Sequence, residues 1–429
     1  MRFFRWALAC VALLPGYAGA SNGFFHTGYS PISSGMGGGG AAYAADAFIV
    51  VNNPAGLVRL KNRTDVGVKL FSPWTKIEVA GNQEETSRHW FPGVNAAKNW
   101  RYKDDLAFGL ALYGNGGIGN KFHDNLFDLA VGGGTPTGAP DTRELSLQMF
   151  NMLLVPSIAW AWNDQHAFGA SLLLAYQRME IRGLGNFQCF TPTAAGDPGC
   201  ATGTPSVLSN QLTNEGKDHA LGIGLRIGWL GEIAPGVRLG IGASTPIFMS
   251  RFDNYSELLP DNGSFDLPAI YLAGIDYEIT PFWRVTLDWQ RTAYESSRAF
   301  SNEGPVATPF GPGLGGADLL GGDRGFGFGW NDQDIYKIGV EHRRGDWQFR
   351  AGYNYGKSQI PKDQLAFGPL HNSIMEHNIT FGFTRALGNN RALTLAFGYG
   401  FKTRQEAITA IGPVELEHSE YVLDLAYSW

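Results

Sequence analysis

Three groups of residues in this 429-residue sequence have types that could do chemistry. The run Gly35–Gly40, GMGGGG, formally satisfies the dinucleotide-binding pattern G-x-G-x-x-G. That pattern requires a preceding strand, a following helix and an acidic residue about 20 positions later. No strand is expected before Gly35, and Leu60 occupies the position twenty after Gly40. The second group is four histidines with no nucleophile elbow or metal spacing around them: His219, His342, His377 and His418. We therefore expect no enzyme, no metal and no cofactor.

The glycine run instead favours a compact, irregular segment over Gly35 to Leu60. Glycine adopts positive φ at little cost, so Gly35 and Gly37 suit tight turns or close approach to other backbone. Asn53-Pro54-Ala55-Gly56 predicts a turn: Pro54 fixes φ, and the Asn53 side chain can bond a backbone amide two residues on. We interpret this stretch as a plug around which the rest of the chain closes.

Charged residues form the third group of candidates, and their positions in alternating segments place them on inward faces. Five are acidic and five are basic, so ion pairs that brace the plug account for most of them. The sharper hypothesis is that Lys337 or Arg350 holds the carboxylate of a ligand. The whole set is Asp276, Glu278, Arg284, Asp288, Lys337, Glu341, Arg343, Arg350, Lys402 and Asp424.

Composition separates a helical membrane protein from a barrel. Hydrophobic residues make up 44% of the chain, but mean hydropathy is only −0.13. Arg2 and Arg5, an apolar core at 6–14 and Ala18-Gly19-Ala20 predict a secretory signal peptide over residues 1–20. Beyond it no uncharged apolar run reaches about 18 residues, which excludes a helical transporter. The net charge of −6 gives no basic footprint for nucleic acid.

From Thr64 onward, apolar and polar residues alternate in segments of about ten or more, as a membrane β-barrel requires. In the last segment Tyr421, Leu423 and Leu425 share one face, with Val422 and Asp424 on the other. Short turns and long Gly- and Pro-rich connections alternate between segments. The fourteen expected strands are 64–80, 91–102, 105–114, 144–162, 165–182, 217–230, 237–250, 264–279, 282–296, 334–344, 347–357, 374–387, 391–404 and 415–429.

Cys189 and Cys200 are the cysteines that remain after the leader, and both fall in one long connection. In an oxidising compartment, an even pair that closes a short loop favours a disulfide. Two free thiols, or a metal pair that lacks further ligands, are the alternatives.

The connections 115–143 and 183–216 carry apolar residues that we expect to be exposed. Phe122, Leu126 and Leu129 have the spacing of one face of a short amphipathic helix, and Phe187 and Phe190 lie in the second connection. An exposed apolar cluster outside the membrane indicates a binding site. The alternative is that these residues only pack the loops together.

Several stretches resemble the N-terminal hatch of the FadL/TodX family of outer-membrane transporters. They are Asn22-Gly23-Phe24-Phe25, Gly35-Met36-Gly37-Gly38, Asp46-Ala47 and Asn53-Pro54-Ala55-Gly56-Leu57. The resemblance implies an all-β fold, a 14-stranded transmembrane antiparallel β-barrel plugged by the hatch. It also implies capture of substrate by the outer loops, rearrangement of the hatch, and lateral exit at a kinked third strand. Here Gly109 is the expected kink, because glycine weakens strand pairing.

We therefore expect a signal peptide over 1–20, a hatch over 21–62 and a barrel over 63–429. The expected function is passive transport of long-chain fatty acids or aromatic hydrocarbons, by a monomer among the lipids and lipopolysaccharide of a Gram-negative outer membrane. The alternatives are a gated or general porin for polar solutes, and a surface adhesin or receptor.

Overall fold

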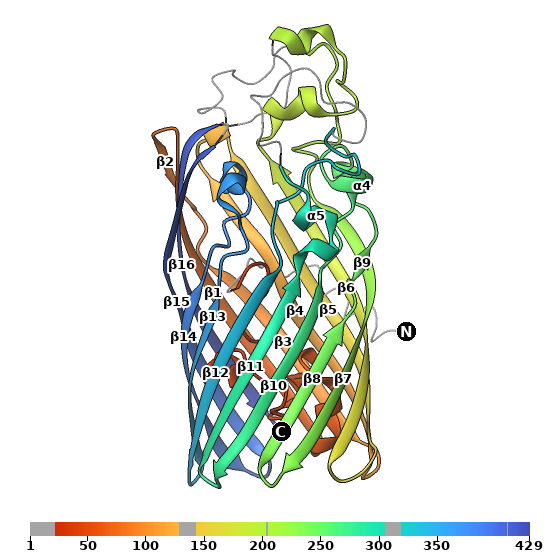
Figure 1. Ribbon diagram of the computed structural model, residues 1–429, viewed down its shortest axis with the longest axis vertical. Helices are drawn as coiled ribbons and strands as arrows, with labels where there is room; N and C mark the ends of the chain where they lie inside the picture. The colour runs from red at the N-terminus through yellow and green to blue at the C-terminus, as the bar shows by residue number, and fades with distance from the viewer. Residues whose placement is uncertain (1–21, 128–142, 203–204, 305–318, 410) are drawn as a thin grey trace.

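The computed structural model describes residues 22–127, 143–202, 205–304, 319–409 and 411–429, which form one closed antiparallel barrel (Figure 1). The predicted signal peptide lies outside the described residues. Within them, fourteen strands make the wall: β1 Arg63–Val79, β3 Phe91–Arg101, β4 Leu106–Phe122, β5 Leu145–Ala161, β6 His166–Arg182, β7 Asp218–Ala234, β8 Val237–Ser244, β10 Ala269–Thr280, β11 Trp283–Ala293, β12 Gln333–Arg344, β13 Trp347–Gly356, β14 His377–Gly388, β15 Arg391–Thr409 and β16 Gly412–Ser428. The predicted all-β, 14-stranded barrel is confirmed.

The barrel closes where its last strand meets its first. β16 pairs with β1 in a register that runs from Asp65 opposite Ser428 to Val79 opposite Val414. Closure is physically required, because an open edge would leave a row of backbone groups unpaired in hydrocarbon. Two short strands, β2 Asn82–Glu85 and β9 Phe248–Met249, pair only with β1 and β7 and add nothing to the circumference. Short turns lie at one end of the barrel and long connections at the other (Figure 1).

Burial follows the predicted alternation. On β16 the side chains of Tyr421, Leu423 and Leu425 are exposed, whereas Asp424 and Ala426 are buried. The apolar exposed rows face lipid and the alternate rows face the interior.

Three strands are longer than expected. β4 continues through the glycine-rich stretch to Phe122, because Gly116 to Phe122 pair with β5 as far as Leu145. β7 runs to Ala234 and so occupies most of the turn expected over 231–236, and β15 runs to Thr409. Pairing with a neighbouring strand outweighs the weak strand preference of glycine and polar residues.

The N-terminal segment, residues 22–62, contains three short helices: α2 Pro31–Gly35, η1 Ala47–Val51 and η2 Pro54–Arg59. Most of its side chains are buried. Figure 1 shows its red ribbon within the outline of the barrel, towards the end with the short turns.

The other short helices belong to the long connections. They are η3 Gly185–Phe190, η4 Pro198–Thr202, η5 Asp253–Tyr255, α4 Pro260–Gly263, η6 Tyr294–Ser296, α5 Arg298–Ser301 and η8 Lys362–Phe367. Within the described ranges, every helix is too short or too polar to cross a membrane.

Candidate functional site

Asn53 ties the N-terminal segment to the wall. Its side-chain oxygen accepts a hydrogen bond from the amide of Ala55 at 3.1 Å and so caps η2, whose first residue is Pro54. Its amide nitrogen donates to the carbonyls of Ala41 and Trp229, each at 2.8 Å. The predicted turn, with Asn53 bonded two residues on, is confirmed. Trp229 lies on β7, so one buried asparagine fixes the turn and docks it on a strand.

The glycine run allows backbone to touch backbone. A side chain on Gly35 would meet the backbone of Gly382 on β14 at 3.3 Å. Gly37 has φ of +69°, and a Cβ there would lie 2.8 Å from the carbonyl oxygen of Tyr353 on β13. The expected close packing is therefore observed at both glycines.

Charged residues on β11 and β12 bond the segment's backbone. Asp288 accepts hydrogen bonds from the amides of Gly40 at 3.2 Å and Ala41 at 2.8 Å. Lys337 donates to the carbonyl of Gly38 at 3.1 Å and to Gln290 at 2.8 Å. Because Asp288 and Lys337 are buried, these contacts also satisfy groups that are costly to leave unpaired.

A second cluster is centred on Glu341, which is fully buried. It accepts hydrogen bonds from Tyr43 of the segment, Arg350 and Arg343, each at 2.8 Å. Arg350 also donates to Thr384 at 2.7 Å. Lys337 and Arg350, the two expected ligand-binding cations, are thus each engaged by protein groups.

The rest of the predicted inward set mostly forms ion pairs in the interior. Arg284 lies 3.4 Å from Asp276, and Asp424 lies 2.9 Å from Lys69. Lys402 differs: its side chain is 63% exposed and pairs with Glu417. A register shift between Gly400 and Thr403 breaks the alternation that had placed Lys402 inward.

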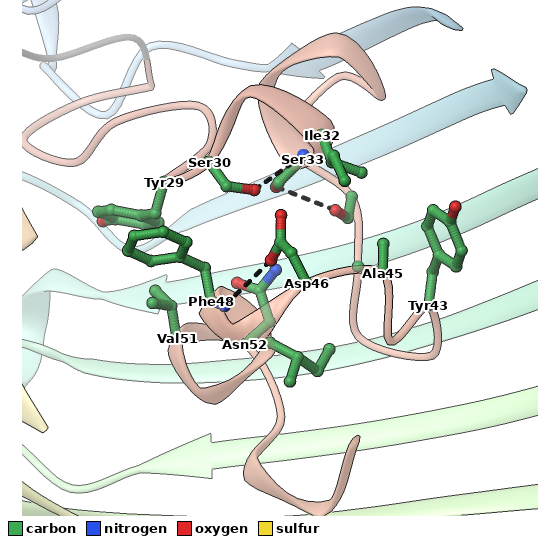
Figure 2. A pocket seen from close by; sticks show the side chains of 13 residues that line it. Tyr29, Ser30, Ile32, Ser33, Tyr43, Ala45, Asp46, Phe48, Val51 and Asn52 are labelled. Carbon is green, nitrogen blue, oxygen red and sulfur yellow. Dashed lines mark hydrogen bonds between the residues drawn. The ribbon is translucent and has the colours of Figure 1, made fainter. Parts of the chain in front are cut away.

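A small cavity lies within the N-terminal segment itself, between α2 and η1 (Figure 2). The Asp46 side chain points into this region and caps η1 by accepting from the amide of Phe48 at 3.0 Å. Burial, reinforced by the charge of Asp65, raises the pKa of Asp46 to about 6. The cavity holds only about 20 Å³, room for a water molecule and not for an organic substrate.

The wall has a discontinuity between β3 and β4. Their ladder ends at Ala96 opposite Leu112, and β4 then shifts register against β5 between Gly114 and Gly116. Asn115, between those two glycines, is the extra residue of a bulge, which bends a strand and terminates pairing. Beyond Leu112, towards the long connections, β4 has no strand partner among the described residues on the side where β3 lies.

The N-terminal segment fills the place that β3 leaves. Phe25 forms an isolated antiparallel bridge with Gly116, and a Cβ on Gly116 would lie 2.2 Å from the carbonyl oxygen of Phe24. Tyr29 donates its hydroxyl to the carbonyl of Asn115 at 3.0 Å, and Asn95 of β3 donates to the carbonyl of Tyr29 at 3.1 Å. Sequence reasoning missed these residues, although Gly114-Asn115-Gly116-Gly117 carries the signal of a bulge.

The expected kink at Gly109 is wrong. Gly109 pairs regularly with Asn99 on one side and Ser157 on the other. A Cβ on Gly109 would lie 2.8 Å from Leu57 and 3.2 Å from Val50. This glycine therefore makes room for the N-terminal segment, and the irregularity lies several residues further along the same strand.

A continuous series of aromatic rings joins the long connections to the N-terminal segment. It begins with Phe190, Phe187 and Phe127, passes through Phe367, Phe326, Phe328 and Phe300, and ends at Phe24 and Phe25. Neighbouring ring centroids lie between 4.9 and 6.3 Å apart, the usual range for stabilising ring contacts. We name this series the aromatic cluster. It ends at the discontinuity in the wall.

The apolar loop residues are buried, and not exposed as expected; they pack the connections together, which was the alternative. Phe122 and Leu126 are fully buried, and Phe187 and Phe190 are 4% and 7% exposed. The prediction of an amphipathic helix over 122–129 is wrong at its start, because Phe122 is the last residue of β4. Leu129 lies outside the described residues.

The disulfide is confirmed. Cys189 at the end of η3 is bonded to Cys200 in η4, with 5.5 Å between their Cα atoms. It flanks Phe187 and Phe190, so it fixes the outermost part of the aromatic cluster.

Comparison with known proteins agrees with this architecture. The family model for outer membrane protein transport protein (OMPP1/FadL/TodX) matches residues 12–367. Among curated proteins, none matches the sequence.

Solved structures share the fold. The P. putida toluene transporter TodX aligns with a TM-score of 0.68 at 18% identity, covering 94% of this chain and 98% of its own. The Ralstonia pickettii toluene transporter TbuX gives 0.62 at 19%, covering 94% and 98%. A Pseudomonas aeruginosa FadL homologue gives 0.67 at 13%, covering 95% and 99%. At these low identities the superpositions show a shared fold and no more. The family model covers well over half of the sequence. The chain therefore belongs to the OMPP1/FadL/TodX family of outer-membrane transport proteins.

Proposed function

We propose that this protein carries hydrophobic small molecules passively from the extracellular side, along the aromatic cluster, and sideways into the membrane between β3 and β4. The observation that carries this proposal is the discontinuity above Ala96 and Leu112. There, the wall is completed by residues 24–29 of the N-terminal segment, which contact β4 without being a strand of the barrel. A segment held by such contacts can leave while the barrel stays closed elsewhere.

Residues 21–62 then act as the hatch, and transport requires Phe24, Phe25 and Tyr29 to move away from Gly116 and Asn115. Lateral release suits apolar substrates, which gain about 25 cal/mol for each Å² that leaves water for lipid. A polar solute gains nothing by that route, because lipid offers its polar groups no hydrogen bonds.

Lys337 and Arg350 serve as anchors in this proposal. Both are buried and bonded to protein atoms, so a ligand carboxylate would have to displace those bonds. The substrate class remains fatty acids or aromatic hydrocarbons. Toluene is the first compound to test, since two of the solved relatives are described as toluene transporters.

The decisive experiment is uptake of radiolabelled toluene, oleate and a polar sugar by cells that lack their own transporter of this type. We expect expression of this chain to stimulate uptake of at least one apolar compound and not of the sugar. Stimulation of sugar uptake alone would contradict the proposal and support the porin alternative. Heat-modifiable migration of the expressed protein on a gel verifies that the barrel has folded.

A further inference from the structure

A cleft of about 390 Å³ opens on the outer face of the wall, where β1, β15 and β16 meet the connection between β2 and β3. Its lining includes Trp74, Lys76, His89, Lys402 and Tyr421. Trp74 and Tyr421 are on the lipid-facing side of their strands and are 44% and 42% exposed. The cleft therefore lies outside the barrel interior and plays no part in the pathway proposed above.

The position of Trp74 along β1 places the cleft at one edge of the membrane. β1 begins at Arg63, eleven residues before Trp74. Arg63 pairs with Asn99 close to the short turn between β3 and β4, and outer-membrane barrels keep their short turns on the periplasmic side. At about 3.3 Å per residue and a tilt of about 40°, Trp74 lies roughly 28 Å along the barrel axis from that end. The apolar band of such barrels is about 25 Å tall. The cleft is thus level with the lipid headgroups of the extracellular leaflet.

The lining changes from aromatic to charged along the membrane normal. Tyr421 packs against Tyr399 with 5.1 Å between ring centroids, and Tyr399 packs against Phe401 at 5.2 Å. Further from the membrane, the lining carries Lys76, Glu85 and the ion pair of Lys402 with Glu417. An amphiphile with acyl chains below and a polar headgroup above has the same distribution of polarity.

The charged part offers partners for both phosphate and hydroxyl groups. Lys76 is half-buried and forms no ion pair with any residue in the described ranges. The side chain of Lys402 is 63% exposed, so its ammonium can also reach a ligand. Ammonium groups bind phosphate, and the carboxylates of Glu85 and Glu417 accept hydrogen bonds from hydroxyls.

A flat aromatic surface completes the site. The rings of Trp74 and His89 stack with 4.0 Å between centroids and an interplanar angle of 11°. His89 is held in place by its Nδ1 contact with the carbonyl of Pro73 at 3.1 Å. Such a platform suits the apolar face of a sugar ring. The two lysines and two glutamates of the lining carry no net charge together. A phosphorylated sugar, whose hydroxyls can also bond the carboxylates, therefore fits this lining better than a bare phosphate does.

We propose that this cleft binds the phosphorylated sugar headgroup of a glycolipid in the extracellular leaflet. Lys76 and Lys402 bind the phosphate, Glu85 accepts from sugar hydroxyls, and Trp74 supports the ring. The acyl chains lie along Tyr421, Tyr399 and Phe401. The lipid would brace the seam at which β16 closes on β1.

The test measures binding of fluorescent lipids to the purified full-length protein in nanodiscs. The three probes are bisphosphorylated lipid A, the same lipid without phosphates, and phosphatidylglycerol. We expect the bisphosphorylated lipid A to bind about tenfold more tightly than either of the others, since it alone provides both phosphate and sugar. Lys76→Gln with Lys402→Gln should weaken its binding about tenfold. Trp74→Leu should weaken both lipid A forms.

Two controls separate the cleft from general charge and from misfolding. Lys103→Gln changes an exposed lysine in the turn between β3 and β4 and should leave binding unchanged. Lys76→Arg with Lys402→Arg keeps both charges and should retain binding. Equal binding of phosphatidylglycerol and lipid A would overturn the sugar assignment. Unchanged lipid A binding by the folded Gln variant would overturn the site.

Discussion

Phe25 pairs with Gly116 as an isolated antiparallel bridge, at the level where β3 no longer pairs with β4. A residue of the N-terminal segment thus takes the position of a neighbouring strand along β4. In the proposed pathway, the bridge and the contacts beside it break, including the hydrogen bond that the Gly114 amide donates to Asn95 at 3.3 Å. The ladder from Ala96 to Arg101 can stay intact.

The first prediction concerns Gly116→Ala. The added methyl would lie 2.2 Å from the carbonyl oxygen of Phe24, so the N-terminal segment must shift away from β4. Overpacking of this kind costs about 1–3 kcal/mol, which moves the equilibrium towards the open wall by about tenfold. We expect a higher open probability in planar-bilayer recordings and faster toluene uptake.

Gly398→Ala is the matched control for this prediction. Gly398 is also a strand glycine, but a Cβ there would make only ordinary contacts at 3.6 Å or longer. Its conductance should equal that of the wild type. A folded Gly116→Ala protein that behaves like the Gly398→Ala control would refute the gating role of residues 24–29.

The second prediction concerns the anchor at Asp288. Asp288→Asn replaces a charged acceptor of two backbone amides, those of Gly40 and Ala41. The amide oxygen of asparagine can still accept both bonds, but a hydrogen bond to a neutral group contributes about 1 kcal/mol less than one to a charged group, so the segment should lose roughly 2 kcal/mol of local stability. Hydrogen exchange at Gly40 and Ala41 should accelerate by about thirtyfold. Asp346→Asn, in an exposed turn, should leave both exchange rates unchanged.

Much of the barrel could be predicted from the sequence because a membrane imposes a strict pattern. Each strand must present an apolar row to lipid and close against its neighbours, so the alternation at Tyr421 and Leu423 identifies both the strand and its orientation. The ends of β4 and β15 could not be predicted this way. Beyond the membrane, the apolar row ends but the backbone pairing continues: Gly116 still pairs with β5, and Thr409 still pairs with β16.

The candidate site was only partly predictable. Asn53 and the glycines carry local conformational requirements, so their roles follow from residue type and spacing. Gly109 misled because a strand glycine has two explanations, a break in pairing or the close approach of another segment. Only the fold shows that Leu57 lies against it. Burial of Phe122 and Phe187 likewise depends on contacts between connections far apart in the sequence.

The third prediction concerns the disulfide. The double substitution Cys189→Ser and Cys200→Ser removes a cross-link between residues that are 11 positions apart in the sequence. The lost constraint on the unfolded loop should lower stability by about 3 kcal/mol. Phe187 and Phe190 flank this bond, so the outer part of the aromatic cluster should loosen while the barrel persists. We expect faster protease cleavage between residues 183 and 216 and a higher apparent KM for toluene. Unchanged cleavage would mean that packing alone holds this connection.

The fourth prediction is a dependence on external pH through His371, which precedes β14. Its ring packs against Phe328 of the aromatic cluster, with 4.9 Å between centroids. Its Nδ1 accepts a hydrogen bond from the indole N–H of Trp330 at 3.2 Å, so the ring must be neutral at that atom. Burial lowers the pKa of His371 to about 3. Below pH about 6.5 the unfolded chain protonates this histidine, whereas the folded protein does not until the pH approaches 3. The folded state is therefore fully stable with respect to this group above pH about 6.5 and loses stability as the pH falls towards 3.

Between pH 6.5 and 4.5 the aromatic cluster should therefore lose about 2 kcal/mol of stability, since each pH unit in this window corresponds to about 1.4 kcal/mol. The measurement is protease cleavage of the long connections at each pH. In His371→Gln the amide oxygen can still accept from Trp330, but the side chain does not titrate. Its cleavage should vary less with pH than that of the wild type. The same pH dependence in both proteins would assign the effect to other groups.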